Sequence, residues 1–277
     1  MRGLIRPPEP QTPAAVADHY DELDLIYSAL WGEHVHHGYW ATSRESPAEA
    51  VVALSDLVGE RLGFGAGDRL VDIGCGYGAT ARHFAKRGAT VTGLTLSAAQ
   101  IVAASPAANV TLLRRDWMAN GLPDAAFDGA YAIESSEHMA DKQRFFAEAR
   151  RVLKPGTRLV VCAWLATEAP RRWEIRHLLE PICEEGRLPS LGRASDYRAM
   201  AGQAGFLCAD YRDISAAVAR TWTICAARFL RALLADPAIR SQVVRARNRR
   251  FALSLPRLIL AYRTGAMRYG VFTFVAQ

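Results

Sequence analysis

One stretch of the chain constrains its fold more than any other. Val71-Asp-Ile-Gly-Cys-Gly-Tyr-Gly-Ala-Thr80 joins a short apolar run to a helix-prone segment, with glycines at positions 74, 76 and 78. Glycines between a strand and a helix let the backbone turn sharply and let a ligand approach it closely. The helix that follows presents unpaired N–H groups at its N-terminus. The stretch therefore predicts a small-molecule site at the carboxyl end of the first strand of a parallel sheet.

Two details separate this loop from the loops that bind dinucleotides. The spacing is Gly-x-Gly-x-Gly with Ala at position 79, whereas the dinucleotide fingerprint is Gly-x-Gly-x-x-Gly. That fingerprint also needs an acid about 20 residues further on, yet no Asp or Glu occurs between Asp72 and Asp116. S-adenosylmethionine (SAM) carries no phosphate, and Asp72 suits its ammonium-bearing end. We expect SAM as the cofactor, with a dinucleotide as the alternative.

Composition limits the class of protein. Half of the 277 residues are hydrophobic and the net charge is only +6, which indicates a globular protein and does not favour nucleic acid as a partner. The five cysteines form no C-x-x-C pair, so we expect reduced thiols and a cytoplasmic location. The N-terminus lacks the apolar core of a signal peptide and no apolar run is long enough to span a bilayer, so stable membrane insertion is not expected. A homo-oligomer is possible.

Strand and helix patterns alternate between Arg69 and Trp164, which predicts a doubly wound parallel sheet of the α/β class. Ahead of it, Thr12-Pro13 begins a helix whose apolar face runs to Leu30. Behind it, Leu165–Arg193 has no clear period and is expected to be a helical insertion, and Tyr269–Val275 a final strand. The expected organisation is a flexible tail (1–13), N-terminal helices with a lid loop (14–64), a SAM-binding core (65–164) and substrate-covering helical insertions with the last strands (165–277).

The segment Trp31–Trp40 concentrates aromatic and imidazole groups around two glycines. We interpret it as a lid over cofactor and substrate, with His37 and Tyr39 reaching inward; a packed loop with satisfied histidines is the plainer alternative. No metal site is expected from His34, His36 and His37, because adjacent side chains rarely converge on one ion without a further ligand.

Polar groups follow two further strands of the expected sheet. Asp116 is placed to accept from an adenine amino group, and Trp117 either packs on the ring or fills the core. Glu134, Glu137 and His138 put two carboxylates and an imidazole within five residues. Such a concentration of acid–base groups at a strand's carboxyl end indicates a catalytic centre, with a solvated turn as the alternative.

A run of arginines lies near the C-terminus. It is expected to be a solvated helix face, with a clamp for a diphosphate or carboxylate substrate as the sharper hypothesis. The run comprises Arg240, Arg245, Arg247, Arg249 and Arg250.

These motifs together resemble the SAM-dependent class I methyltransferases of the tocopherol methyltransferase group, relatives of cyclopropane fatty acid synthases. The likeness rests on Trp31–Trp40, on the glycine loop and on Gly93-Leu-Thr-Leu-Ser-x-x-Gln100, where most class I methyltransferases have an acid at the position of Thr95. Glu134-Ser-Ser-Glu-His-Met-Ala-Asp-Lys142 and Leu255-Pro…Tyr262…Gly265…Tyr269-Gly-Val complete it. The resemblance implies a Rossmann-like, seven-stranded sheet with its last strand antiparallel and helical lid insertions.

The resemblance also implies site residues and a reaction. Cofactor binding is assigned to Asp72, Gly74, Cys75, Gly76, Gly78, Thr95, Leu96, Gln100, Asp116, Trp117, Glu134 and His138. For catalysis we expect Glu137 or His138 to accept a proton, together with Glu134, Tyr39 and His37, and Trp31 and Trp40 to add cation–π stabilisation.

Family members act on aromatic carbons, indole-type nitrogens and alkene carbons of isoprenoid diphosphates. The expected reaction is methylation of a ring carbon of an aromatic or heteroaromatic natural-product acceptor. The alternatives are an alkene carbon of a prenyl diphosphate, a nitrogen or oxygen of a small metabolite, and a noncatalytic SAM-binding protein. Lipid cyclopropanation and RNA methylation are less favoured, because neither a basic membrane-docking segment nor an RNA-binding motif is evident.

Overall fold

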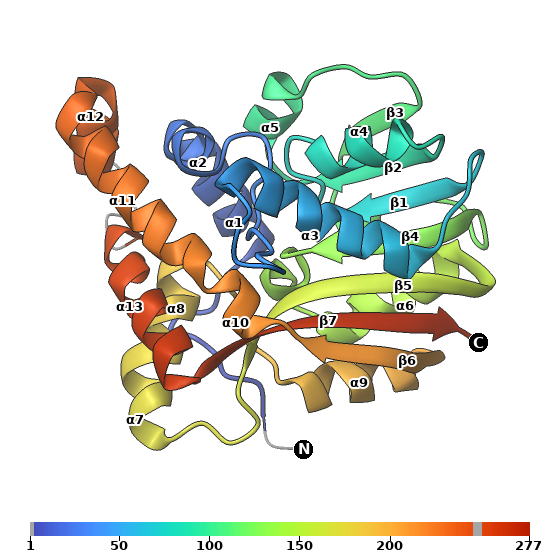
Figure 1. Ribbon diagram of the computed structural model, residues 1–277. Helices are drawn as coiled ribbons and strands as arrows, with labels where there is room; N and C mark the ends of the chain where they lie inside the picture. Colours follow the sequence, from blue (N-terminus) through green and yellow to red (C-terminus); the bar gives the residue numbers. More distant parts are fainter. Residues whose placement is uncertain (1–2, 246–250) are drawn as a thin grey trace.

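A single mixed sheet organises the molecule (Figure 1). The computed structural model describes residues 3–245 and 251–277, and in them seven strands lie in the order β3-β2-β1-β4-β5-β7-β6. Strands β1 to β5 are parallel, and β7 pairs antiparallel with both β5 and β6. The seven-stranded sheet with an antiparallel last strand is thus confirmed. The strands are β1 Arg69–Ile73, β2 Thr90–Thr95, β3 Val110–Arg114, β4 Phe127–Ile133, β5 Leu153–Ala166, β6 Phe206–Asp213 and β7 Met267–Ala276.

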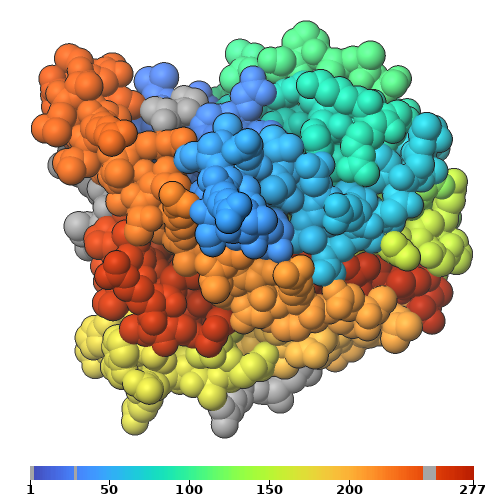
Figure 2. Space-filling view, in the orientation of Figure 1, coloured from blue at the N-terminus to red at the C-terminus, as the bar shows by residue number. Residues whose placement is uncertain are grey.

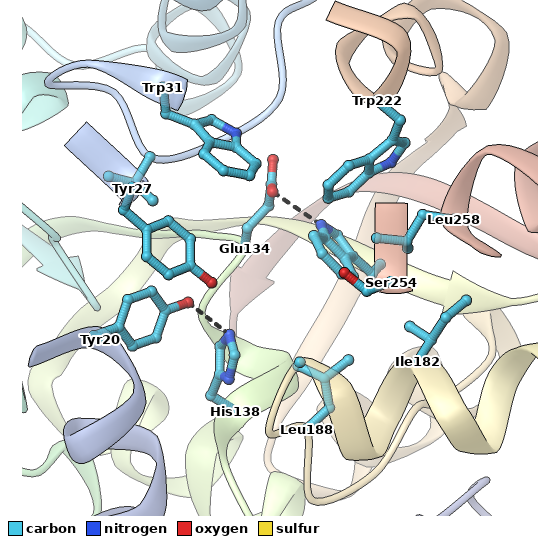
Figure 3. Close-up of a pocket in the computed structure, with 13 residues that line it drawn as sticks. Tyr20, Tyr27, Trp31, Glu134, His138, Ile182, Leu188, Trp222, Ser254 and Leu258 are labelled. Carbon is cyan, nitrogen blue, oxygen red and sulfur yellow. Dashed lines mark hydrogen bonds between the residues drawn. The ribbon is translucent and has the colours of Figure 1, made fainter. Parts of the chain in front are cut away.

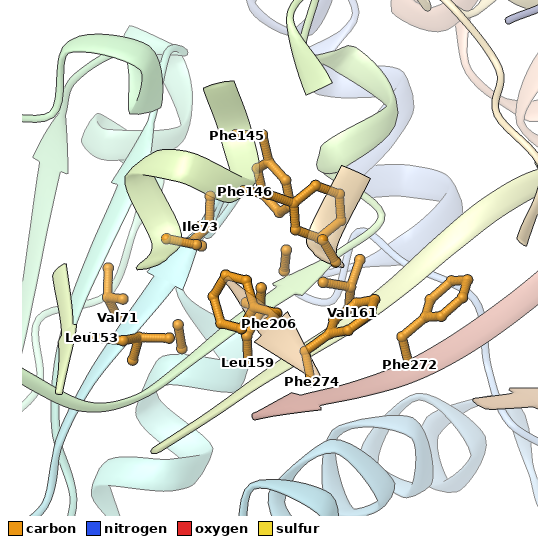
Figure 4. Packing of buried hydrophobic residues seen from close by; sticks show 14 of the residues in the cluster. Val71, Ile73, Phe145, Phe146, Leu153, Leu159, Val161, Phe206, Phe272 and Phe274 are labelled. Carbon is orange, nitrogen blue, oxygen red and sulfur yellow. The ribbon is translucent and has the colours of Figure 1, made fainter. Parts of the chain in front are cut away.

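Helices cover both faces of the sheet. On one face α6 (Lys142–Val152) and α9 (Ala194–Gln203) bury a cluster rich in phenylalanine (Figure 4). On the other face α3 (Pro47–Leu62), α4 (Ala79–Ala85) and α10 (Ser215–Val218) pack on the opposite side chains of the same strands. Truncating a fully buried phenylalanine of such a core costs about 3–5 kcal/mol.

Local sequence explains the boundaries of α3. Ser46 accepts the Glu49 N–H at 3.3 Å while the Glu49 carboxylate accepts the Ser46 N–H at 2.8 Å. This capping box satisfies two free donors at the first turn, and Pro47 fits there because its missing N–H has no helical partner. Gly63, with φ of +66°, ends the helix in the left-handed region.

A helical body covers the carboxyl ends of the parallel strands, at the left of Figure 1. Its core joins residues from both ends of the chain. In Figure 2 the orange C-terminal helices lie against the blue segment that includes α3, and the red segment lies on their far side from it. The remaining helices are α1 Pro13–Glu22, α2 Asp24–Trp31, α5 Ala98–Ala103 beside β2 and β3, α7 Arg172–Glu174, a π-helix Ile175–Leu179, α8 Glu180–Glu185, α11 Arg220–Ala235, α12 Pro237–Arg245 and α13 Phe251–Thr264.

The single helix expected from Pro13 to Leu30 is wrong, because the helix breaks at Leu23. Leu23 leaves the helical region with φ −100° and ψ 12°. On one side of the break Asp21 accepts from Ser97 and Ala99 at the start of α5, and on the other Asp24 accepts from the Tyr77 hydroxyl. The change of axis lets both carboxylates reach these loops, while Leu23 itself is buried.

Two other local expectations also differ from the structure. Residues 3–12 do not form a free tail: Ile5 is buried and pairs antiparallel with Leu191, N to O 3.0 and 2.7 Å. Lys154-Pro-Gly156 has the composition of a turn, yet it lies within β5, where the β4–β5 register shifts between Phe127 and Gly129. Long-range pairing partners decide both features, and local sequence carries no signal for them.

The arginine run is only partly within the described residues. Arg240 donates to the carbonyls of Leu233 and Leu234 at 2.9 and 3.0 Å, so it caps the C-terminus of α11. Arg245 is exposed, and Arg247, Arg249 and Arg250 lie outside the described residues. All five cysteines are free thiols. Across the described helices, none combines the length and the apolar character that crossing a bilayer requires.

Candidate active site

The glycine loop and the ends of β2 and β4 enclose one side of a cavity of about 300 Å³. The N–H groups of Gly74 and Cys75 both donate to the Leu94 carbonyl, at 2.9 and 2.8 Å, which turns the chain sharply after β1. Gly74 has φ of +83°, and a Cβ there would lie 2.3 Å from the Ser135 Cβ. The loop therefore needs glycine at this position for both its conformation and its close approach to β4.

Most of the residues assigned to cofactor binding line this cavity. Thr95 organises its second wall: its hydroxyl donates to Gln100 Oε1 at 2.7 Å and accepts from the Ser97 N–H at 3.3 Å. Ser97 in turn accepts the Gln100 N–H at 3.1 Å and caps α5 (Ala98–Ala103). The assigned residues that line this cavity are Gly74, Gly76, Thr95, Leu96, Gln100, Asp116, Trp117, Glu134 and His138.

Asp116 and Trp117 have structural partners as well as a place at the cavity. Asp116 Oδ1 accepts the Met118 N–H at 2.8 Å and caps a short 3-10 helix, Trp117–Ala119. Trp117 packs in the core and donates from Nε1 to the Phe145 carbonyl at 3.2 Å. The core-filling and ligand-facing interpretations of Trp117 are therefore compatible.

A smaller cavity of about 40 Å³ continues from Gly74 and Gly76 towards the lid loop. It is lined by Asp72 and Cys75 on one side and by His34 and His36 on the other. Asp72 is buried, and burial raises the pKa of its carboxyl to about 7. This cavity offers one buried acid to a cationic ligand group.

The lid-loop histidines bond to one another and to the backbone. His34 Nδ1 and His36 Nε2 lie 3.1 Å apart, and His36 Nδ1 lies 2.8 Å from the His37 carbonyl. Burial lowers the pKa of both His34 and His36, so both rings are neutral and both His36 nitrogens are engaged. Within residues 3–245 and 251–277 no cluster of three or more potential metal ligands occurs.

An aromatic chamber of about 50 Å³ adjoins the cofactor cavity on its other side (Figure 3). Tyr20, Val35, Glu134 and His138 line both spaces. The remaining walls come from α2, β5, α8 and the segment after it, α11 and α13, and include Tyr27, Trp31, Trp164, Ile182, Leu188, Trp222 and Leu258.

Glu134 is a buried carboxylate with four hydrogen-bond donors. Its Oε1 accepts from the His37 N–H and the Tyr269 hydroxyl, both at 2.7 Å. Its Oε2 accepts from His37 Nδ1 at 2.8 Å and from Trp164 Nε1 at 2.9 Å. Burial alone would raise the pKa of Glu134, but the charge and hydrogen bonds of His37 outweigh it and bring this pKa to about 2. Glu134 is therefore a fixed anion in the wall between the two spaces, held at a left-handed φ of +53°.

His138 is the basic group of the shared wall. Burial lowers the pKa of its imidazole to about 4, while burial raises the pKa of the Tyr20 hydroxyl. Tyr20 Oη and His138 Nε2 lie 2.9 Å apart; with the ring proton on Nδ1, the hydroxyl donates and the neutral ring accepts. A neutral imidazole with an accepting nitrogen beside both cavities is suited to general-base chemistry.

Glu137, expected beside the acceptor, lines neither of these two spaces. Its carboxylate accepts from the backbone N–H of Trp164 and, at 3.1 Å, from the Ser136 hydroxyl. Buried Lys142 donates to the Glu137 carbonyl at 3.2 Å and to Ser190 at 3.0 Å. Glu137 and Lys142 thus hold the 3-10 turn Ser136–His138 that presents His138.

Three further expectations about the site need correction. Tyr39 packs beneath α3 with Leu54 and lines none of the cavities described above, so it does not reach inward. Trp40 lies outside the chamber and donates to the Glu45 carbonyl at 3.0 Å. Gly78 caps α4 and packs against Leu112 instead of facing the cofactor cavity. His37, by contrast, does reach inward, to Glu134.

Four aromatic residues of the site were not singled out from the sequence as site residues. They are Tyr20, Tyr27, Trp164 and Trp222. Tyr20 and Tyr27 recur at helical spacing and Trp222 belongs to an amphipathic helix, so each has the pattern of ordinary core. The only sequence signal is the hydroxyl that the two tyrosines carry on an otherwise apolar face.

The glycine loop allows a direct test of the close approach at Gly74. Gly74→Ala is expected to abolish cofactor binding or prevent folding, because a Cβ there meets the Ser135 side chain at 2.3 Å. Gly156→Ala is the control: it also has positive φ, +78°, but nothing lies within 4 Å of its Cβ. The control should cost only about 1 kcal/mol of left-handed strain. Calorimetry with S-adenosylhomocysteine and thermal unfolding would measure both; equal effects would contradict the steric explanation.

The fold and this site together define a class of protein: a Rossmann-like methyltransferase that uses SAM. A family model described as a methyltransferase domain matches residues 71–161. The chain is 34% identical to 27-O-demethylrifamycin SV methyltransferase of Amycolatopsis mediterranei (strain S699), over 79% of this chain and 83% of the relative. It is 29% identical to the probable chloroplastic tocopherol O-methyltransferase of Oryza sativa subsp. japonica, over 93% and 76%. The chain belongs to the SAM-dependent small-molecule methyltransferases, as its motifs predicted.

A solved structure matches over almost the whole length. The crystal structure of the cyclase SpnF superposes with a TM-score of 0.77 and 28% identity, covering 99% of both chains. The helical body is therefore shared with this neighbour along with the sheet.

Proposed function

We propose that the enzyme transfers the methyl group of SAM to a hydroxyl oxygen of an uncharged, hydrophobic small molecule, with His138 as the general base. The observation that carries this proposal is the neutral imidazole of His138 in the wall shared by the cofactor cavity and the aromatic chamber. SAM, when bound, supplies an electrophilic methyl group on a sulfonium. The chain's own part is to orient the acceptor, exclude water and take up the hydroxyl proton.

The chamber's lining supports an uncharged acceptor. Among the residues that the structure describes, no lysine or arginine lines the chamber. The carboxylate of Glu134 already accepts hydrogen bonds from four donors. A diphosphate would need cations or a metal to offset its desolvation. The chamber therefore favours an aromatic or otherwise apolar alcohol or phenol over a prenyl diphosphate.

The polar groups of the wall have complementary parts in the proposed reaction. Tyr20 holds the lone pair of His138 Nε2, and an acceptor hydroxyl would take the place of the Tyr20 hydroxyl on that nitrogen. Proton transfer to Nε2 makes an imidazolium, which the nearby anion Glu134 stabilises. Because its pKa is about 2, Glu134 stays ionised and acts by its charge, without taking the proton itself.

The site of methylation is the finer part of the proposal. Of the two relatives described above, one is named a tocopherol O-methyltransferase and the other a methyltransferase of 27-O-demethylrifamycin SV, which supports oxygen over the ring carbon expected from sequence. Incubating the enzyme with 13C-methyl SAM and a panel of phenols, hydroxyquinones and indoles, then recording the carbon spectrum of the product, distinguishes the two. An O-methyl signal is expected, and a new C-methyl signal would overturn the choice of oxygen.

A second candidate is a cyclisation without methyl transfer, favoured by the full-length likeness to the cyclase SpnF. This alternative predicts that S-adenosylhomocysteine binds and that no label leaves SAM with any acceptor. His138 would then have no proton to accept, and its substitution would leave the reaction unchanged.

We also assign the amino-acid end of SAM to the small cavity beside Asp72. Because burial raises the pKa of Asp72 to about 7, the carboxyl is protonated below that pH and cannot pair with an ammonium. The dissociation constant of SAM is expected to rise about tenfold between pH 8 and pH 6. Calorimetry across this range should show the trend, and Asp72→Asn should bind weakly with little pH dependence. A flat wild-type profile would contradict the assignment.

A further inference from the structure

A groove of about 510 Å³ lies outside the lid loop, and the reaction proposed above does not use it. Val51 and Val52 of α3 form one wall, and Ile224 and Cys225 of α11 form the other. The loop that separates the groove from the active site is thin, since His34 and His36 line both the groove and the small cavity beside Asp72.

Trp31 separates this groove from the aromatic chamber. Its side chain belongs to the lining of both spaces and is half-buried. Inside the chamber its ring contacts Tyr27 and Trp222, with centroids 5.3 and 6.1 Å away (Figure 3). Arg228 donates to the Leu30 carbonyl at 2.5 Å and so holds the end of α2 that carries Trp31.

The chamber is too small to hold a complete acceptor in this arrangement. Its volume of about 50 Å³ accommodates roughly four water molecules, which is less than one substituted ring. The opposite walls are closely packed, because Ile182, Leu188 and Leu258 are each no more than 2% exposed. Trp31 is half-buried and lines both spaces, so movement of its ring joins the chamber to the groove.

We propose that the groove is a second acceptor subsite, which receives the apolar distal part of an elongated acceptor, and that Trp31 is the gate between it and the chamber. This inference rests on the proposed function, since it takes the chamber as the place of the methylated end. The charged residues of the groove lining already have partners: Glu33 pairs with Arg82, and Arg228 donates to the Leu30 carbonyl. The apolar walls therefore identify the occupant's chemistry: an uncharged alkyl or polycyclic extension that gains affinity by leaving water.

Matched phenols test the subsite. In wild-type enzyme 4-octylphenol should be methylated with a lower KM than 4-methylphenol. Ile224→Trp and Val52→Trp fill the groove from opposite walls, and each is expected to raise the KM for 4-octylphenol about tenfold while leaving that for 4-methylphenol unchanged. Ala227→Trp, at an exposed position of the same helix, is the matched control and should change neither. Trp31→Ala should raise the kcat/KM for 4-octylphenol relative to 4-methylphenol.

Binding of 4-octylphenol in the presence of S-adenosylhomocysteine, measured by calorimetry, gives a readout independent of turnover. Weakened binding in both groove variants supports the subsite even if neither phenol is methylated, in which case the proposed reaction alone fails. Binding unaltered in both variants, or an equal change for both phenols in correctly folded variants, would overturn the subsite. Thermal unfolding of each variant verifies folding.

Discussion

His138→Ala is expected to reduce kcat by about 10²–10⁴-fold while changing the dissociation constant of SAM by less than about threefold. The imidazole is the neutral base of the wall shared by cofactor cavity and chamber, and its loss leaves the acceptor hydroxyl with no partner able to take its proton. The bulk of the cofactor cavity is formed by other residues, so cofactor affinity should persist. Transfer of labelled methyl and calorimetry with SAM measure the two quantities separately.

A second variant separates the base from its hydrogen-bond partner. Tyr20→Phe removes the hydroxyl that bonds His138 Nε2 but keeps the ring, so it should cost no more than about tenfold in kcat.

The pH dependence of kcat is a further test of the base. Since the pKa of His138 is about 4, the base is deprotonated throughout the neutral range and kcat should not fall between pH 8 and pH 6. An acid limb near pH 6.5, or equal loss of SAM binding and turnover in His138→Ala, would show that the residue acts otherwise.

Glu134→Gln is expected to lower the free energy of unfolding at pH 7 by about 3–5 kcal/mol and to weaken SAM binding. The carboxylate accepts from four donors, whereas a glutamine has one accepting oxygen and presents an amide group to the remaining donors. Two or more buried donors then lose their partner. The variant also removes the anion that favours a cation in the adjoining cavity. Urea unfolding and calorimetry measure the two effects.

The pH dependence separates this charge effect from simple loss of packing. The folded pKa of Glu134, about 2, lies below the ordinary glutamate value of about 4.3, so its stabilisation is present above pH 4.3 and is lost as pH falls towards 2. The difference between wild type and Glu134→Gln should therefore shrink between pH 7 and pH 3. Glu168→Gln is the control, since among the described residues this exposed carboxylate bonds only Ser195; a comparable loss there would refute a special role for Glu134.

Sequence reasoning was accurate where a structure depends on neighbouring residues. The helix start at Thr12-Pro13, the glycine turn after β1 and the alternation of strand and helix each follow from short-range chemistry. The failures occur where a distant segment intervenes. Leu23 breaks a helix because Asp21 and Asp24 have partners in two other loops, and Ile5 is ordered because Leu191 lies beside it.

The acid–base groups after β4 show the same limit at the site. Their spacing predicted that acid–base groups cluster here but did not predict which way each side chain points. In the 3-10 turn Ser136–His138, the side chain of His138 lies in the chamber wall, whereas Glu137 belongs to a buried network with Ser136 and Lys142. Glu134, one residue beyond the strand, is held by donors from the lid loop, β5 and β7. None of these partners is near it in sequence.

The residues of the chain, taken in order, were thus enough to establish the sheet, the glycine loop and SAM as cofactor, because each depends on backbone conformation encoded within a few positions. The acceptor chamber came only from the folded molecule. Its walls are contributed by α1, α2, β5, α8, α11 and α13, and their side chains have the periodicity of ordinary core until packing brings them around one space. An aromatic residue fills the core or lines a cavity according to the side chains that pack opposite it. Those side chains come from distant parts of the sequence, so a local pattern cannot predict them.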